Sequence, residues 1–353
     1  MSDFREIVDD KNWQEFERFI KDADSKIEED MEKSLKKREE YRKFLINNLK
    51  LREQVVKTTE NQILEAEKQL FSGNVVATDG TLSTFPLLTG VRCRIGVVAT
   101  SYKNDTIEKI LYVSEREFAE KLASSPKEYF ELLEKGSGVS SLFLQGIMSF
   151  KEREVALGRK EEWKFIHGHL VPMEIRVPRL GPGAFETCLE LAEKIVKHKK
   201  CVGIISGSTK FSYVNAGIIL EPGEYMFANY VSDDVQQEID EAIGNAQEKK
   251  ALTQLRDQYL AKIRIGVFRV GPKPYVFEAH EDYFDEAAGL VIRDSLNQSL
   301  RGFPLLIDYA DCVCRRMLAT DDFNQLIEHK LAKKGGYYGY GFDMPERMLR
   351  RRG

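Results

Sequence analysis

The sequence predicts an α/β domain with a mixed sheet, preceded by a long helical arm. Residues 1–72 are dominated by Glu, Lys, Asp and Arg and contain no proline. From residue 73 onward, short β-rich runs alternate with helical patterns, and the first of these runs follow one another closely. Intermixed strands and helices are typical of α/β domains, and the neighbouring strands near the start indicate a mixed sheet.

The first 72 residues are expected to form one or two long helices. Apolar residues recur close to helical spacing, at Phe16, Phe19, Ile20, Ile27 and Met31. A narrow apolar stripe of this kind fits a solvated helical arm or hairpin, and it also fits an arm for dimerisation or partner docking. The sequence leaves both interpretations open.

Residues 73–333 are expected to form the main domain. Its predicted strands are NVVATDGTLS, GVRCRIGVVAT, KILYVSE, KFIHGHL, CVGIISG, KIRIGVFRVG, YVFEA and FPLLID. Helices are predicted over about 115–134 and 139–161, at FETCLELAEKIVKHK, and over about 285–300 and 309–333.

The C-terminal tail, residues 334–353, differs from the domain before it. Glycine and tyrosine alternate in KKGGYYGYGF, and four arginines crowd the end of the chain. Such a tail is either a flexible terminus or an aromatic and basic contact for single-stranded nucleic acid or an acidic partner.

Composition narrows the class of protein. The 353 residues carry a net charge of −4, so DNA binding would depend on local basic patches. The five cysteines include no C-x-x-C pair, which argues against a zinc ribbon or disulfide framework. The acidic N-terminus is unlike a signal peptide, and no apolar run approaches the ~18 residues of a membrane span. We therefore expect a cytoplasmic protein without a membrane partner.

Two carboxylates are candidates for chemistry. Asp79 stands where a strand exits into Asp-Gly-Thr, although Asp-Gly is also a common hairpin turn. Glu154 shares a predicted helical face with Ile147 and Phe150, and a carboxylate among apolar residues needs a cation or a proton. An ion pair with a core arginine would also satisfy it. Glu152 lies on the other side of this helix and is the weaker candidate.

Further candidates lie at other strand and helix ends. His167 and His169 are two residues apart on a strand, so they share a face, and neutral imidazoles are good metal ligands. Either could equally be a hydrogen-bonded core histidine. Asp311 opens a late helix, where N-terminal dipole stabilisation is its ordinary role. Lys210 follows a strand among glycine and small hydroxyl residues, where it could neutralise a phosphate or simply face water.

Together these candidates suit one class of site. The chain offers a carboxylate on a first strand, a glutamate on a helix, a ligand at a strand end, a lysine, and an acidic residue at a late helix. This order suits a ribonuclease-H-like nuclease, in which acidic residues gather around divalent ions that activate water and stabilise the reacting phosphate.

The order and the residues of these motifs resemble those of the NurA family, DNA-end-processing nucleases that work with the HerA hexameric ATPase. The resemblance covers roughly residues 73–333. Its motifs are ATDGT, KEREVAL, IHGHL, GIISGSTK and GFPLLIDYAD, in that order. The family has aspartate where this chain has His167, and histidine where this chain has Asp311. The two positions have exchanged residue types, so the inventory of two aspartates, one glutamate and one histidine is kept.

The resemblance implies a specific activity. Asp79, Glu154, His167 and Asp311 would bind Mn²⁺ or Mg²⁺. Lys210 would contact the scissile phosphate or hold the attacking water, and His169 would be a further ligand or a proton shuttle. The activity would be 5′-3′ exonuclease and single-strand endonuclease cleavage of DNA. Because the exchange is reciprocal, we expect a functional site and not a decayed copy.

Partners are implied in the same way. The resemblance implies a homodimer and a HerA-like hexameric ATPase that feeds DNA to the nuclease, in DNA repair or anti-phage defence. The chain itself has no G-x-x-x-x-G-K-[ST] loop, so we expect no ATP hydrolysis through a P-loop. The alternative is a non-catalytic adaptor that uses the arm and tail to bind a motor or DNA, with the acidic residues in structural ion pairs.

Overall fold

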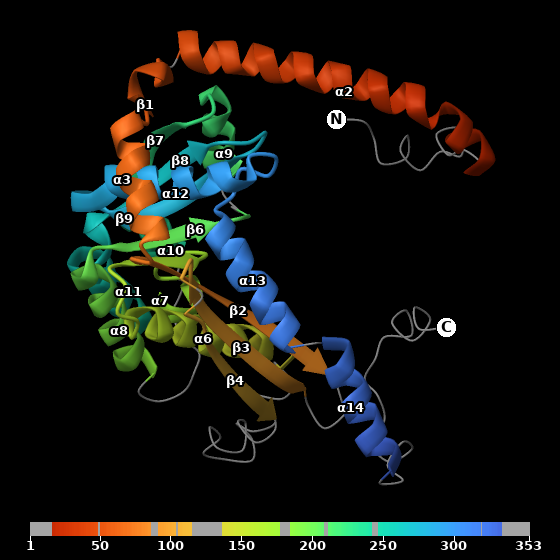
Figure 1. Cartoon of the computed structure of the whole chain (residues 1–353), viewed down its shortest axis with the longest axis vertical. Coiled ribbons are helices and arrows are strands. Elements are labelled where there is room, and N and C mark those ends of the chain that lie inside the picture. The colour runs from red at the N-terminus through yellow and green to blue at the C-terminus, as the bar shows by residue number, and fades with distance from the viewer. Residues whose placement is uncertain are drawn as a thin grey trace. The chain divides into compact units, whose positions relative to one another are not determined.

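The computed structural model describes residues 16–48, 50–85, 91–103, 105–114, 136–176, 184–207, 211–241, 246–318 and 320–333, and the chain divides into two units (Figure 1). The first unit, Met1–Gln54, contains helix α2 (Phe16–Asn47) and the 3-10 helix η2 (Leu51–Gln54). On α2, Ile27, Met31 and Leu35 are spaced four residues apart, and each is more than half exposed. The helix expected in the arm is therefore present over this range.

The second unit, Val55–Gly353, begins before the boundary predicted at residue 72. Strand β1 (Val55–Lys57) pairs with β7 (Glu224–Tyr230), and helix α3 (Glu60–Phe71) packs against α12 (Phe284–Ser295). A capping box starts α3, in which Thr59 and Gln62 each accept a hydrogen bond from the backbone N–H of the other. The last helix of the predicted arm thus belongs to the main domain.

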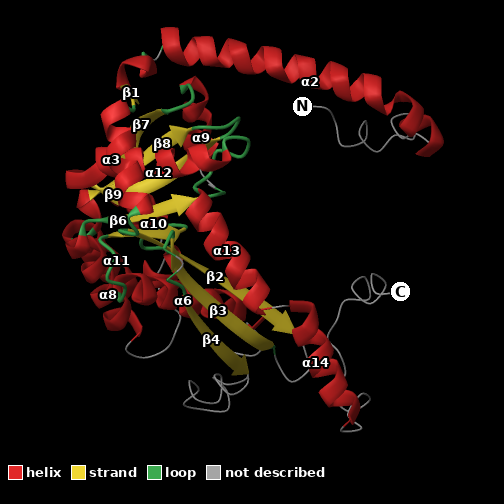
Figure 2. Cartoon of the chain, in the orientation of Figure 1, coloured by secondary structure: helices red, strands yellow, loops and turns green. Residues whose placement is uncertain are grey.

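Among the described residues, nine strands form one mixed sheet in the order β1-β7-β8-β9-β6-β5-β2-β3-β4 (Figure 2). β2 (Val75–Phe85), β3 (Arg92–Ser101) and β4 (Ile107–Ser114) form an antiparallel meander. β5 (Trp163–His167) runs parallel to β2, and β6 (Cys201–Ile205) runs parallel to β5. A meander whose first strand continues on its other side into two successive parallel strands, here β5 and then β6, is the ribonuclease-H-like arrangement, so the predicted fold class is confirmed.

The far side of the sheet extends this arrangement. β9 (Pro274–His280) pairs antiparallel with β6, and β8 (Ile263–Arg269) and β7 follow in antiparallel order. The other described helices are α9 (Phe211–Ala216), α10 (Val231–Glu241), α11 (Ala246–Gln258), α14 (Thr320–Lys333), η3 (Gly217–Ile219), η4 (Leu260–Lys262), η5 (Glu281–Tyr283) and η6 (Leu296–Gln298). No helix in the described ranges combines the length and the apolar character needed to cross a bilayer.

Helices pack on both faces of the sheet. Gly80 of β2 faces Glu152 of α6 (Gly136–Leu157), whereas Gly96, which pairs with Thr81, faces Leu318 of α13 (Leu305–Leu318). Successive residues of a strand point to opposite faces, so α6 and α13 lie on opposite sides of β2 and β3. Helices α7 (Met173–Arg176) and α8 (Ala184–His198) pack with α6.

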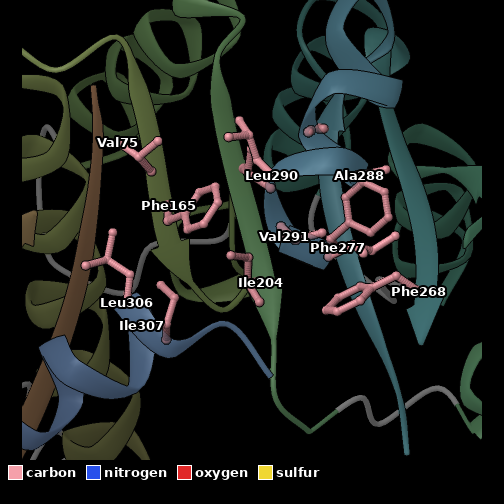
Figure 3. Close-up of a cluster of buried hydrophobic side chains, with 14 of the residues drawn as sticks. Val75, Phe165, Ile204, Phe268, Phe277, Ala288, Leu290, Val291, Leu306 and Ile307 are labelled. Atoms are coloured by element: carbon pink, nitrogen blue, oxygen red, sulfur yellow. The ribbon is translucent and has the colours of Figure 1, made fainter. Parts of the chain in front are cut away.

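The main apolar cluster lies on the face covered by α3, α12 and α13 (Figure 3). Alternate residues of the central strands point into it, and the helices contribute residues spaced three and four apart. Members drawn in Figure 3 include Val75, Phe165, Ile204, Phe268, Phe277, Ala288, Leu290, Val291, Leu306 and Ile307. This packing fixes α13 against β2 and thereby positions the candidate site.

Several local predictions differ from the structure. FPLLID is the start of α13 and not a strand, because its apolar residues continue a buried helical pattern through Leu318, and Pro304 is compatible with a helix start. Asp79 and Gly80 lie inside β2 and not in a hairpin turn. Strand β7 and helices α10 and α11 were not predicted. The helix expected over about 115–134 lies outside the described residues.

Candidate functional site

Asp79 lies where β2 and β5 separate. The two strands pair as far as Thr78 and Ile166, and β2 then continues beside β3 alone. The next residue on each strand is Asp79 or His167, and the Asp79 Oδ1 is 2.7 Å from the His167 Nδ1. The end of this parallel pairing therefore brings together two residues that are 88 positions apart in the sequence.

His167 is hydrogen-bonded through both ring nitrogens. Its Nε2 lies 2.9 Å from the Oγ of Ser206, the residue directly after β6. Burial opposes the charged imidazole, but the hydrogen bond and charge of Asp79 together raise the pKa of His167 above its usual value. Gly168 follows with φ +90°, which lets the chain turn away from the strand. The imidazole is thus held between Asp79 and Ser206.

Glu152 reaches the site from α6, on the opposite face of the sheet. Its side chain is buried, and its Oε2 accepts a hydrogen bond from the Arg153 Nη1 at 2.6 Å. A Cβ on Gly80 would lie 2.4 Å from the Glu152 Oε1, so the carboxylate occupies the space that this glycine leaves open. Burial raises the pKa of Glu152 to about 7 despite Arg153, and the charge of Asp79 adds to the rise.

Asp311 approaches from α13. Its Oδ1 accepts a hydrogen bond from the Arg315 Nε at 2.8 Å, one helical turn further along. Burial raises the pKa of Asp79, the bond to His167 opposes this rise, and Asp311 adds to it through its charge and a hydrogen bond. Asp79 is thus in contact with one carboxylate and near another, an arrangement that favours binding of a cation.

Asp79, His167 and Asp311 line a pocket of about 480 Å³, whereas the buried Glu152 is not part of the lining. Its wall combines the acidic groups with polar and apolar side chains, and the lining residues are Asp79, Gly80, Thr81, Leu82, Gln145, Met148, Ser149, His167, Glu174, Asp311 and Arg315. The pocket is therefore accessible to a ligand from solvent.

The turn after His167 is fixed by a buried carboxylate. Glu278 of β9 lies with its Oε1 2.6 Å from the His169 Nδ1, and its Oε2 accepts the Leu170 N–H at 2.8 Å. Arg153 donates to the carbonyl oxygens of His169 and Leu170 from the other side. His169 is thus a structural partner of Glu278 in this arrangement, and these contacts hold the chain that carries His167.

The structure brings together three of the predicted site residues, namely Asp79, His167 and Asp311. It does not bring Glu154 to them: the expectation that Glu154 is buried was wrong, because its side chain is 51% exposed and pairs with Lys151. Glu152, the weaker candidate, is the buried glutamate. Lys210 lies outside the described residues.

The sequence did contain a signal for Glu152. Leu144, Met148, Glu152 and Ala156 recur every four residues, and this row faces the sheet. The competing row through Ile147 and Glu154 is also apolar, so the pattern alone supported either glutamate. Ser206 was not singled out, because a serine after a strand is too common to draw notice.

The carboxylate oxygens around Asp79 are donors of the kind that a divalent ion binds. Within the described ranges, no group of three or more His, Cys, Asp or Glu side chains is already arranged as a ligand set. The oxygen donors of Asp79, Glu152 and Asp311 are nevertheless those that Mg²⁺ and Mn²⁺ prefer. A bound cation would stabilise the charged forms of Asp79 and Glu152, whose pKa values are raised. His167 could ligate an ion only by giving up a hydrogen bond. The contacts of His167 therefore fit a role in orienting Asp79 better than a role as a metal ligand.

Burial of Glu152 predicts a stability that falls with pH in metal-free protein. Between the usual pKa of 4.5 and about 7, the unfolded chain loses the Glu152 proton while the folded chain keeps it, so rising pH destabilises the fold. Glu152→Gln removes this loss and keeps an acceptor for Arg153. Urea unfolding in EDTA should show the variant equal to wild type near pH 4 and more stable by about 2–3 kcal/mol at pH 8. A difference that is constant with pH would contradict the assignment.

Comparison with known proteins gave structural but not sequence matches. No family model matches the chain, and no curated protein matches it. The NurA nuclease from Sulfolobus solfataricus is similar in structure, with a TM-score of 0.49 and 14% identity over 75% of this chain and 86% of that one. NurA bound to dAMP and manganese has a TM-score of 0.47 and 10% identity, covering 82% and 93%.

A third similar structure is the catalytic domain of human Endonuclease V. It has a TM-score of 0.34 and 15% identity, over 83% of this chain and 99% of that one. The chain is thus similar in structure to NurA nucleases, the family that its sequence motifs resemble.

Proposed function

We propose that this chain is a divalent-metal-dependent nuclease that hydrolyses phosphodiester bonds of DNA. The observation that carries the proposal is the meeting of Asp79 and Asp311 in one open pocket of a ribonuclease-H-like sheet, with the buried Glu152 close to Asp79 behind the pocket wall. Asp79 comes from β2, Glu152 from α6 and Asp311 from α13, on both faces of the sheet. Burial raises the pKa values of Asp79 and Glu152, and perturbed pKa values of neighbouring carboxylates are characteristic of functional sites.

Each residue has a proposed role. Asp79, Glu152 and Asp311 would hold the ion through their carboxylate oxygens. When bound, a divalent ion would supply positive charge at the reacting phosphate and a more acidic water. His167 orients the Asp79 carboxylate through its Nδ1, and Ser206 fixes the imidazole through its Nε2. Arg153 holds Glu152 in place.

The finer features of the activity rest on the resemblance of the motifs. They support DNA as the substrate, Mn²⁺ or Mg²⁺ as the ion, and cleavage from a 5′ end together with cutting of single strands. They also support a homodimer that works with a HerA-like hexameric ATPase, in DNA repair or anti-phage defence. A gene for such an ATPase beside the gene for this chain would strengthen the proposal.

The activity is tested with the full chain and labelled oligonucleotides. Single- and double-stranded DNA labelled at the 5′ or 3′ end should be cleaved with Mn²⁺ or Mg²⁺ and not in EDTA. Asp79→Asn should lower the cleavage rate at least ~100-fold, because the central oxygen donor loses its charge. The rate is measured by gel electrophoresis of the labelled products.

The same assay separates the nuclease from a non-catalytic adaptor. DNA binding without cleavage under any metal condition, together with no Mn²⁺ binding by calorimetry, would refute the nuclease and favour the adaptor. Cleavage that Asp79→Asn leaves unchanged would place the activity elsewhere in the chain.

A further inference from the structure

Arg315 is the cationic side chain in the described lining of the pocket. The acidic groups of that lining are Asp79, Glu174 and Asp311, and no lysine or other arginine accompanies Arg315 there. A phosphodiester is an anion, so its approach to this wall is opposed by carboxylates unless a positive charge meets it. Arg315 is therefore the residue of this lining best suited to attract a phosphodiester.

The placement of Arg315 leaves it free to bind a second anion. Its Nε donates to the Asp311 Oδ1 at 2.8 Å, while the side chain is 72% exposed. Within the described part of the chain, its two terminal nitrogens have no hydrogen-bond partner. A guanidinium presents five N–H donors in a fixed planar fork, which matches the oxygens of a phosphate.

Asp311 connects this arginine to the proposed ion. The same carboxylate is in contact with Asp79 and would be shared between Arg315 and a divalent cation. A nearby guanidinium opposes binding of a cation at Asp311 and favours binding of an anion beside it. Arg315 thus weakens binding of the divalent cation and strengthens binding of the phosphate.

We propose that Arg315 docks a backbone phosphate of the nucleic acid strand at the mouth of the pocket and releases Asp311 to the ion as it does so. The inference rests on the proposed function, which it deepens by naming a residue that binds the substrate. Arg315 is therefore a substrate-binding residue, and the anion that it recognises is a phosphodiester.

The test compares Arg315→Gln with Arg316→Gln. Arg316 is the next residue of α13, is exposed, and does not line the pocket, so its loss removes the same charge from the same helix. Arg315→Gln should tighten Mn²⁺ binding about 3–10-fold, as measured by calorimetry without DNA. It should weaken binding of a phosphorothioate single strand about 5–10-fold and lower the salt slope by about one, as measured by fluorescence anisotropy.

The opposite signs distinguish docking from structural damage. Damage to α13 would weaken the affinities for Mn²⁺ and for DNA together, and that result would overturn the inference. Unchanged DNA binding by Arg315→Gln would also overturn it, and so would an equal effect of Arg316→Gln. The phosphorothioate strand keeps the readout independent of cleavage. If the wild-type protein cleaves DNA and Arg315→Gln changes neither affinity, the proposed nuclease activity stands and the docking role of Arg315 is refuted. If the wild-type protein never cleaves DNA but Arg315→Gln binds Mn²⁺ more tightly and DNA more weakly, the nuclease activity is refuted and the docking role of Arg315 stands.

Discussion

Glu152→Gln should abolish most DNA cleavage, whereas Glu154→Gln should leave the rate within about twofold of wild type. The two residues lie two positions apart on α6, but Glu152 is buried beside Asp79 and Glu154 is exposed and paired with Lys151. Loss of a charged oxygen donor from the ion site should cost about 10²–10³ in rate. Loss of an exposed ion pair costs little.

The measurement is the initial rate of cleavage of a labelled single strand at saturating Mn²⁺. Each glutamate is the control for the other, because both substitutions remove one charge from one helix without changing its size. Glu152→Gln should also remain folded, since the metal-free variant is expected to be more stable than wild type at pH 8. A larger loss for Glu154→Gln than for Glu152→Gln would contradict the assignment and restore the prediction made from the sequence.

Gly80→Ala should disable the site through one added methyl group. The new Cβ would lie 2.4 Å from the Glu152 Oε1 and 2.7 Å from the Met148 Cγ, closer than real Cβ atoms pack. The Glu152 side chain cannot easily move away, because it is buried and hydrogen-bonded to Arg153. We expect the free energy of unfolding to fall by about 1–3 kcal/mol, as for other overpacked cores, and cleavage to fall with the displaced carboxylate.

Gly289→Ala is the matched control. Gly289 is a buried glycine within α12, but a Cβ there would meet its nearest atoms at 3.7 Å, an ordinary contact. Alanine favours the helix by up to ~1 kcal/mol, so this variant should be unchanged or slightly more stable and fully active. Chemical denaturation and the cleavage assay report both quantities. A Gly80→Ala protein with wild-type stability and activity would show that Glu152 does not depend on the space beside β2.

The predicted and observed sites differ for reasons that particular residues make clear. Asp79, His167 and Asp311 were singled out from local patterns, and His167 does end a strand. Asp79 lies inside β2 and Asp311 in the middle of α13, so the strand end and the helix start expected at these two residues were wrong although both residues line the pocket. Glu152 was passed over because α6 has apolar residues on more than one side, so periodicity does not say which side meets the sheet. The contact depends on Gly80, 72 residues earlier in the chain, because a Cβ there would overlap the Glu152 carboxylate.

The sequence by itself determined the α/β class, the helical arm, most strands of the sheet, and three residues of the site. These follow from the spacing of apolar residues along one segment, which is local information. Only the tertiary structure decided that Asp79–Gly80 lies within a long strand, that His169 pairs with Glu278, and which glutamate of α6 is buried beside Asp79. Each of these depends on which surfaces of distant segments pack together, and that packing is set by volume and charge contributed from both sides at once.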